Sequence, residues 1–230
     1  MARGEYRLRV CYRKAGRLRW LSHLEVARSL ERVIRRSGLA YSVTRGFSPH
    51  MKIAFGPALP VGTAGEREYL DVWVTRYTES EDALTRLKNA APADLEPSSA
   101  QYMAEAAPSL GAAATVATYE VRVKGKEVDP RSVQAALDVI RARGQLQVEQ
   151  KRKTKVFDLA LSLPKEPSVK DDNGTVVVEM AVRMGPQGSL RPEVLLQSAF
   201  AATSLEGAVT GVTRTDTLVE DEDGGWSRPV

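Results

Sequence analysis

The order of strand-like and helix-like segments in the first hundred residues constrains the fold more than any other feature. Residues 5–13 alternate between apolar and polar side chains, which predicts a half-buried strand. Ser22 lies three residues before Glu25, a capping-box spacing, and predicts a helix that runs to Ser37 and stops at Gly38. The segments that follow are β-prone pieces at 40–44 and 52–56, a strand at 67–75, a helix at 80–90 and a weaker strand within 94–103.

The same order recurs in the second half of the chain. The expected elements there are a strand at 118–124, a helix at 130–143, strands at 145–151, 154–163 and 174–183, a helix at 190–202 and a strand at 207–217. A β-α-β-β-α-β order is typical of the ferredoxin-like fold, in which two helices cover one face of a four-stranded antiparallel sheet. We therefore predict an α+β protein of two tandem ferredoxin-like domains with antiparallel sheets, the second with an extra strand or hairpin.

Composition shifts place the expected domain boundaries. We predict a basic domain at 1–103, an alanine-rich linker at 104–117 and a second domain at 118–218. Residues 219–230 contain four consecutive acidic residues, at 220–223, and are expected to form a disordered tail.

Cysteine content and hydropathy exclude several classes of protein. Cys11 is the single cysteine of 230 residues, which excludes an internal disulfide framework, a multi-cysteine zinc site and a self-contained iron–sulfur cluster. The sequence has no run of about 18 apolar residues, and its first residues lack the apolar core of a signal peptide. We therefore expect a cytoplasmic protein without a membrane partner.

Positive charge is concentrated in the N-terminal part of the chain. Residues 1–60 hold 13 lysines and arginines but three glutamates, whereas the whole chain has a net charge of only +4. On the helix expected at 22–37, four arginines share the outward side: Arg28, Arg32, Arg35 and Arg36. Such a block favours an anionic partner, nucleic acid first, although a solvated basic surface without a partner is an equally simple reading.

The face of the first sheet that the helices leave open is a second candidate RNA surface. The alternation of two neighbouring strands places Arg7 and Arg9 beside Tyr69, Asp71 and Trp73. Bases stack on aromatic rings and phosphates pair with arginine, as in readers of single-stranded RNA. The alternative is a structural Arg9–Asp71 pair covered by the second domain. No ribonucleoprotein consensus is present.

Both histidines lie in unusual local sequences. His23 is in the first turn of the predicted helix and is the one candidate for a catalytic group, with a structural histidine as the alternative. His50 lies in a loop with Phe47, between Arg45 and Lys52, which suits either an anionic ligand or a plain connection. No phosphate-binding loop, dinucleotide fingerprint or nucleophile elbow is present, and no residue spacing indicates a metal site.

Four strings resemble a known family. They are GRLRWLSHLE at 16–25, SVTRGFSPH at 42–50, ALPVG at 58–62 and EYLDV at 68–72. Together they resemble the radical-SAM-linked proteins, a bacterial domain of unknown function found beside or fused to radical S-adenosylmethionine (radical-SAM) proteins. The resemblance is dense over 5–75 and faint beyond residue 100.

The resemblance implies a radical-SAM partner encoded nearby. The iron–sulfur cluster and S-adenosylmethionine would sit on that partner, and this chain would bind no cofactor itself. Our first hypothesis is a non-catalytic accessory protein that binds RNA or an RNA-containing substrate through its basic domain, although the residues leave open whether the chain is an enzyme. The candidate ligand- or RNA-binding residues are Arg7, Arg9, Arg19, Ser22, His23, Arg28, Arg32, Arg45, Phe47, His50, Lys52, Tyr69 and Trp73.

Two alternatives remain. The first is a metal-independent endoribonuclease that uses His23, assisted by His50 or Lys52. It draws on an outline resemblance to the CRISPR repeat-processing endoribonucleases, and fold alone does not fix function. The second is a standalone RNA-binding module acting on ribosome-related substrates.

Overall fold

The protein has a mixed α+β fold with antiparallel strand pairing, as predicted. The structure is a computed structural model that describes residues 4–150, 153–185 and 188–229. It divides into two compact units, one made of 1–114 and 221–230, the other of 115–220. The ends of the chain and the predicted strand end at residue 151 lie outside the described residues.

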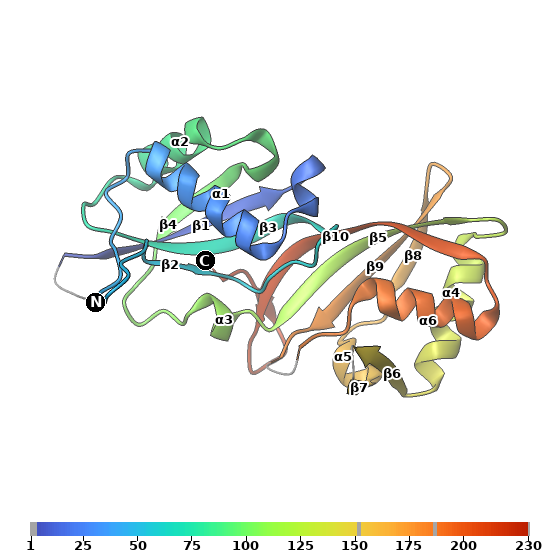
Figure 1. The fold of residues 1–230 in the computed structure, drawn as a ribbon. Helices are drawn as coiled ribbons and strands as arrows, with labels where there is room; N and C mark the ends of the chain where they lie inside the picture. The colour runs from blue at the N-terminus through green and yellow to red at the C-terminus, as the bar shows by residue number, and fades with distance from the viewer. Residues whose placement is uncertain (1–3, 151–152, 186–187, 230) are drawn as a thin grey trace. The chain divides into compact units, whose positions relative to one another are not determined.

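The first unit is a small antiparallel sheet with helices α1 and α2 on one face (Figure 1). Its sheet has the strand order β4-β1-β3-β2. The elements are β1 (Tyr6–Lys14), η1 (Gly16–Trp20), α1 (His23–Arg36), β2 (Ile53–Phe55), β3 (Ala64–Val74), α2 (Ser80–Ala90), η2 (Ala93–Leu95), β4 (Pro97–Tyr102), α3 (Leu110–Ala113) and β11 (Trp226–Ser227). The two predicted helices are confirmed almost to the residue. The β-prone piece at 40–44 forms only isolated bridges, Tyr41 to Val74 and Val43 to Met51.

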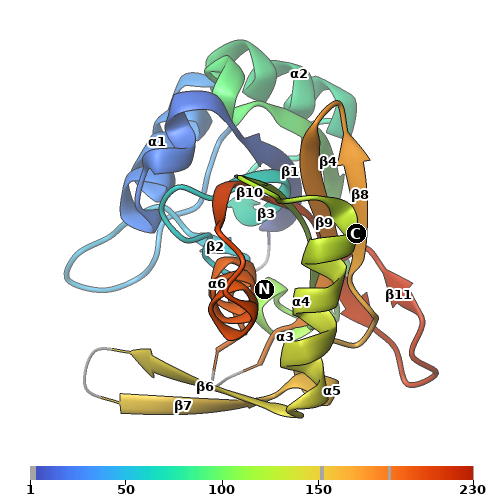
Figure 2. The same cartoon turned by 90° about the vertical axis from the view of Figure 1, so that its right-hand side faces the viewer.

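The second unit has the sheet order β10-β5-β9-β8, again antiparallel. Its elements are β5 (Val116–Gly125), α4 (Pro130–Ala142), β6 (Gln145–Gln150), β7 (Lys153–Asp158), α5 (Leu159–Ser162), β8 (Ser168–Asp172), β9 (Thr175–Arg183), α6 (Pro192–Thr203) and β10 (Gly207–Glu220). Strands β6 and β7 form a separate two-stranded hairpin (Figure 2). The strand predicted at 154–163 is therefore wrong in its second half, where Asp158 caps the short helix α5 by accepting from the Leu161 amide. The sequence analysis missed β8, whose polar residues carry little apolar alternation.

Helix α1 buries one side against the sheet and exposes the other. Val26, Leu30, Val33 and Ile34 are buried in a core with residues of β1 and β3. Leu24, although apolar, is 68% exposed. At about 100° per residue it lies roughly 160° away from Val26, so its side chain joins the arginine side of the helix.

The other face of the first sheet is not open. Arg9 lies directly opposite Asp71 in the β1–β3 register, which confirms the pairing of the structural alternative but not the expected cover by the second domain. The Asp71 carboxylate is fully buried and accepts from Arg7 Nε (2.8 Å) and Nη2 (2.5 Å) and from Arg9 Nε (2.7 Å) and Nη2 (2.9 Å). Tyr69 is also buried. The expectation that Arg7, Arg9, Tyr69 and Asp71 face solvent is therefore wrong, and Trp73 is half-buried.

Segments that we predicted as a linker and a disordered tail cover this face. Arg7 donates to the carbonyls of Ala107 and Pro108, both at 2.8 Å, and Arg9 donates to the carbonyl of Pro229. Leu110 of α3 packs with Cys11 and Tyr69. Residues 104–114 and 221–229 thus belong to the first unit, which corrects the predicted boundaries at 103 and 219.

Replacing Asp71 with alanine tests this arrangement. The variant leaves two buried guanidinium groups without their shared carboxylate, and we expect it to lower the free energy of unfolding by about 3–5 kcal/mol. Urea unfolding followed by circular dichroism measures the change. The control is Asp82→Ala, which removes an exposed pair with Arg86 on α2 and should leave stability close to wild type. Equal losses in the two variants would contradict a central role for Asp71.

Candidate functional site

A capping box fixes the start of α1 and with it the position of His23. The backbone N–H and the hydroxyl of Ser22 donate to Glu25 Oε2 at 2.8 and 2.7 Å, as the sequence spacing predicts. The hydrogen bond from the Ser22 hydroxyl holds the pKa of Glu25 below its usual value, with a further contribution from the Ser22 backbone. Ser22 therefore has a structural role whether or not it contacts a ligand.

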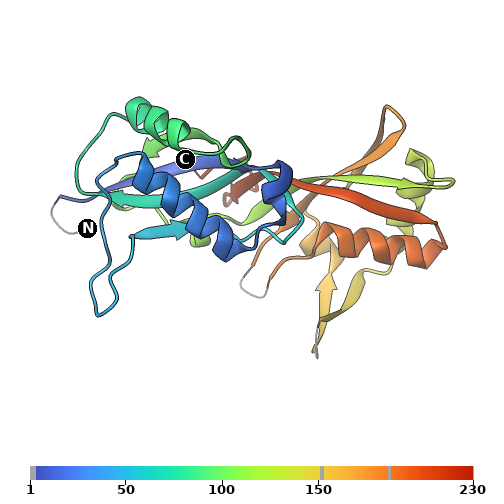
Figure 3. The same cartoon turned by 45° about the horizontal axis from the view of Figure 1, so that its top comes forward.

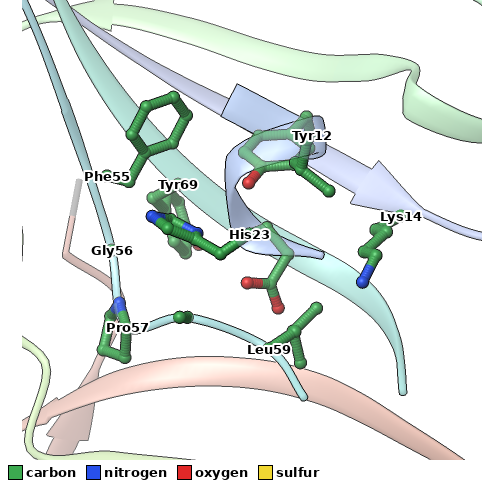
Figure 4. Close-up of a pocket in the computed structure, with 11 residues that line it drawn as sticks. Tyr12, Lys14, His23, Phe55, Gly56, Pro57, Leu59 and Tyr69 are labelled. Carbon is green, nitrogen blue, oxygen red and sulfur yellow. The ribbon is translucent and has the colours of Figure 1, made fainter. Parts of the chain in front are cut away.

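His23 lines a pocket at the end of the sheet of the first unit. Along the helix it lies about 60° from Val26, toward the core side. The polar lining consists of Tyr12, Lys14, His23, Glu68 and Tyr69, and the apolar lining of Val26, Phe55, Gly56, Pro57, Ala58 and Leu59. Figure 4 shows the side chains of His23, Tyr12 and Tyr69 converging on one space. The pocket thus gathers several titratable groups around one exposed histidine.

Most of these polar groups are withdrawn from water. Lys14 is 2% exposed and Glu68 is 4% exposed, whereas His23 is exposed at the rim. Lys14 Nζ donates to the Leu21 carbonyl at 3.0 Å, and the His23 ring meets Phe55 edge-on at 5.4 Å. Buried charged groups in a concave site are typical of places where proteins bind ligands or transfer protons.

A glycine makes room for the buried carboxylate. A Cβ at Gly65 would lie 2.5 Å from Glu68 Oε1, so any larger residue would displace this side chain. Sequence reasoning missed Tyr12, Lys14 and Glu68 as site residues. The sequence held one signal for them: Lys14 and Glu68 lie on two strands, β1 and β3, that pair with each other.

His50 and Lys52, expected to assist His23, are not among the pocket residues. The His50 ring lies 3.1 Å from Thr44 Oγ1 and 3.2 Å from the Ser48 carbonyl. Lys52 donates to Glu5 at 2.6 Å and lies 5.0 Å from the centre of the half-buried Trp73 ring. The hydrogen bond from Lys52 holds the pKa of Glu5 below its usual value. The geometry of these two residues is that of local structural anchors.

The exposed side of α1 carries more cations than its two glutamates, Glu25 and Glu31, can pair with. Arg35 pairs with Glu31 at 2.8 Å, and Glu25 is engaged by Ser22. Arg28, Arg32 and Arg36 are exposed, and within the part of the chain that the structure describes they form no ion pair. We call these three residues the arginine face. Arg32 Nε also donates to the Arg28 carbonyl at 3.2 Å, which holds its side chain along the helix.

Three further candidates lie in the segments before and after this helix. Arg19 is half-buried, and its guanidinium lies 5.1 Å from the centre of the exposed Trp20 ring. Arg45 and Phe47 lie in the loop between α1 and β2, and both are exposed. Of the predicted binding residues, the structure therefore leaves the helix and loop members accessible and buries Arg7, Arg9 and Tyr69.

Over residues 4–150, 153–185 and 188–229, no group of three or more His, Cys, Asp or Glu side chains could hold a metal ion. Within the same ranges, no helix has the length and hydropathy needed to cross a membrane.

Comparisons with known proteins give one family match. The family described as "Uncharacterized protein conserved in bacteria (DUF2344)" matches residues 7–192. No curated protein matches the chain.

Among solved structures, a Cbf5-Nop10-Gar1 complex matches with 10% identity and a TM-score of 0.49, and an archaeal box H/ACA sRNP Nop10-Cbf5 complex with 13% identity and a TM-score of 0.46. Each match covers 94% of this chain and 50% of the other, so the chain spans about half the length of these structures. An unknown protein from Galdieria sulphuraria matches at 14% identity over 89% of this chain and 97% of its own, with a TM-score of 0.27.

Proposed function

The chain belongs to the bacterial family DUF2344, and we propose that it is a non-catalytic accessory protein that binds RNA through its first unit and partners a radical-SAM enzyme. The observation that carries the RNA part is the arginine face, where Arg28, Arg32 and Arg36 project from one exposed side of α1. Guanidinium groups without acidic partners in the described chain are free to pair with phosphates.

The arrangement favours a nucleic-acid backbone over a compact anion. The arginine face extends along two turns of a helix, or about 12 Å, which suits successive phosphates of a chain. We also infer that each unit is a ferredoxin-like domain. The strand orders β4-β1-β3-β2 and β10-β5-β9-β8 support this inference.

The partner would supply the cofactors. A radical-SAM cluster requires several thiolates, and the single cysteine of this chain, Cys11, is 5% exposed. These residues do not fit a cluster, so we place the iron–sulfur cluster and S-adenosylmethionine on the partner. The candidate contact residues are three exposed apolar side chains of the first unit, Trp20, Leu24 and Val61, which are 60%, 68% and 59% exposed. The backbone next to Val61 lies against Trp20, since a Cβ at Gly62 would be 2.9 Å from the Trp20 ring.

RNA binding is tested with the double variant Arg28→Ala/Arg32→Ala. We expect the binding of a labelled RNA by wild type to weaken as the salt concentration rises. Each phosphate contact on a single strand contributes about 0.7 to the slope of log K against log salt, so the loss of two contacts should reduce the magnitude of that slope by about 1.4. Fluorescence anisotropy across a salt series gives both quantities.

The matched control for this experiment is Arg86→Ala/Lys88→Ala, which removes two exposed cations from α2 of the same unit. It should bind like wild type. Salt-independent binding, or equal losses in the two double variants, would refute the role of the arginine face.

The partnership is tested by co-purification with the radical-SAM protein encoded beside this chain. We expect a stable complex that Leu24→Asp weakens, because the new carboxylate would have to lose its water in an apolar contact. Leu161→Asp is the control, since Leu161 is 64% exposed in the second unit. Failure to recover any complex with the wild-type chain would refute the proposed partnership.

The pocket favours a second candidate function, metal-independent RNA cleavage. His23 would accept the proton of a 2′-hydroxyl as that oxygen attacks the adjacent phosphorus. The bond from phosphorus to the 5′ oxygen then breaks, and a proton returns to the leaving oxygen. The products are a 2′,3′-cyclic phosphate and a 5′-hydroxyl. The supporting observation is the pocket that brings His23 together with Lys14, Tyr12 and Glu68.

Cleavage is tested on labelled RNA in the presence of a chelator. In this second function, His23→Ala lowers the cleavage rate by at least about 100-fold, the usual contribution of a general acid–base group. His50→Ala, which changes the histidine outside the pocket, should cleave at the wild-type rate. Intact RNA after incubation with the wild-type chain would eliminate this function.

A further inference from the structure

The loop between α1 and β2 is a hairpin with an ordered base. Val43 forms an antiparallel bridge with Met51, which is buried in the core of the first unit. The Thr44 N–H donates to the His50 carbonyl at 2.8 Å, and the His50 N–H donates to Thr44 Oγ1 at 3.2 Å. These contacts hold the 43–51 hairpin in place without using the side chains at its tip.

The tip presents an aromatic ring to solvent. Phe47 is 110% exposed, more than in the extended reference peptide, and Arg45 beside it is exposed. Gly46, with a φ of 137°, provides a backbone conformation that other residues rarely adopt. Figures 2 and 3 show this blue loop extending away from the helices and strands of the first unit. Both faces of the ring are therefore open to a flat partner.

We propose that the 43–51 hairpin is a stacking site for an unpaired nucleobase, so that the first unit selects single-stranded RNA over duplex RNA. This inference rests on the proposed RNA binding and deepens it by naming the substrate class. In a single strand, a base can turn out and stack on Phe47 while Arg45 pairs with a neighbouring phosphate. In a duplex, the faces of the bases are already occupied by their neighbours.

Charge favours RNA over a protein as the occupant of the tip. Within the described chain, the tip residues Arg45 to Pro49 include one cation and no acidic residue. The helix that leads to the hairpin carries the arginine face on its exposed side. Cations that hold the backbone and an exposed aromatic ring that stacks a base are the usual combination in single-strand binding.

The test compares a mixed-sequence 12-nucleotide RNA, single-stranded and as a blunt duplex, by fluorescence anisotropy. We expect wild type to prefer the single strand. Phe47→Ala should weaken single-strand binding by about tenfold and leave duplex binding unchanged, and Phe47→Tyr should retain the preference. Val139→Ala, which shortens an exposed apolar side chain of α4 in the second unit, is the control and should behave like wild type.

The possible failures are distinguishable. If both RNAs bind equally well and Phe47→Ala changes neither, the stacking site is refuted while RNA binding by the arginine face stands. If Phe47→Ala spares RNA binding but weakens capture of the radical-SAM protein, the tip docks a protein and the inference is overturned. If neither RNA binds to wild type, the proposed function fails and the inference with it.

Discussion

The first unit depends on one buried carboxylate. Asp71 lies in β3 and accepts hydrogen bonds from Arg7 and Arg9 of β1, so two buried cations share one anion and donate their other hydrogen bonds to chain carbonyls. Burying unpaired guanidinium groups would be very unfavourable, and the shared carboxylate is what permits it. This network seals one face of the sheet beneath residues 104–114 and 221–229, and it leaves the helix side for contact with other molecules.

The net charge of a segment therefore overstates the charge that is exposed for a partner to bind. Of the cations in the first 60 residues, Arg7, Arg9 and Lys14 are buried and make internal hydrogen bonds. The arginine face remains in water. Its geometry follows from the periodicity of α1, because residues four apart share a side while the apolar residues fill the core. The same periodicity turns His23 toward the pocket.

The sequence predicts the helices well because their signals are local. A capping box and a glycine stop define α1, and Asp129-Pro130 with Gly144 define α4, whose Asp129 side chain accepts from the Ser132 amide at 2.7 Å. The pairing of Arg9 with Asp71 was also predictable as one of two alternatives, since strand register follows from the topology. What local patterns do not encode is which segment covers a sheet face, because that depends on contacts such as Arg7 to Ala107, one hundred residues apart. The pocket was missed for the same reason, as Lys14, His23 and Glu68 come from three different elements.

Ultraviolet crosslinking of the chain to RNA containing 4-thiouridine, followed by mass spectrometry of the peptides, tests the central claim most directly. The claim is that RNA contacts the exposed side of α1 and the 43–51 hairpin, and not the sealed sheet face. We expect crosslinked peptides from residues 23–51, with Phe47 among the modified residues. Crosslinks concentrated on β1 and β3 around Arg7, Arg9 and Tyr69 would contradict it.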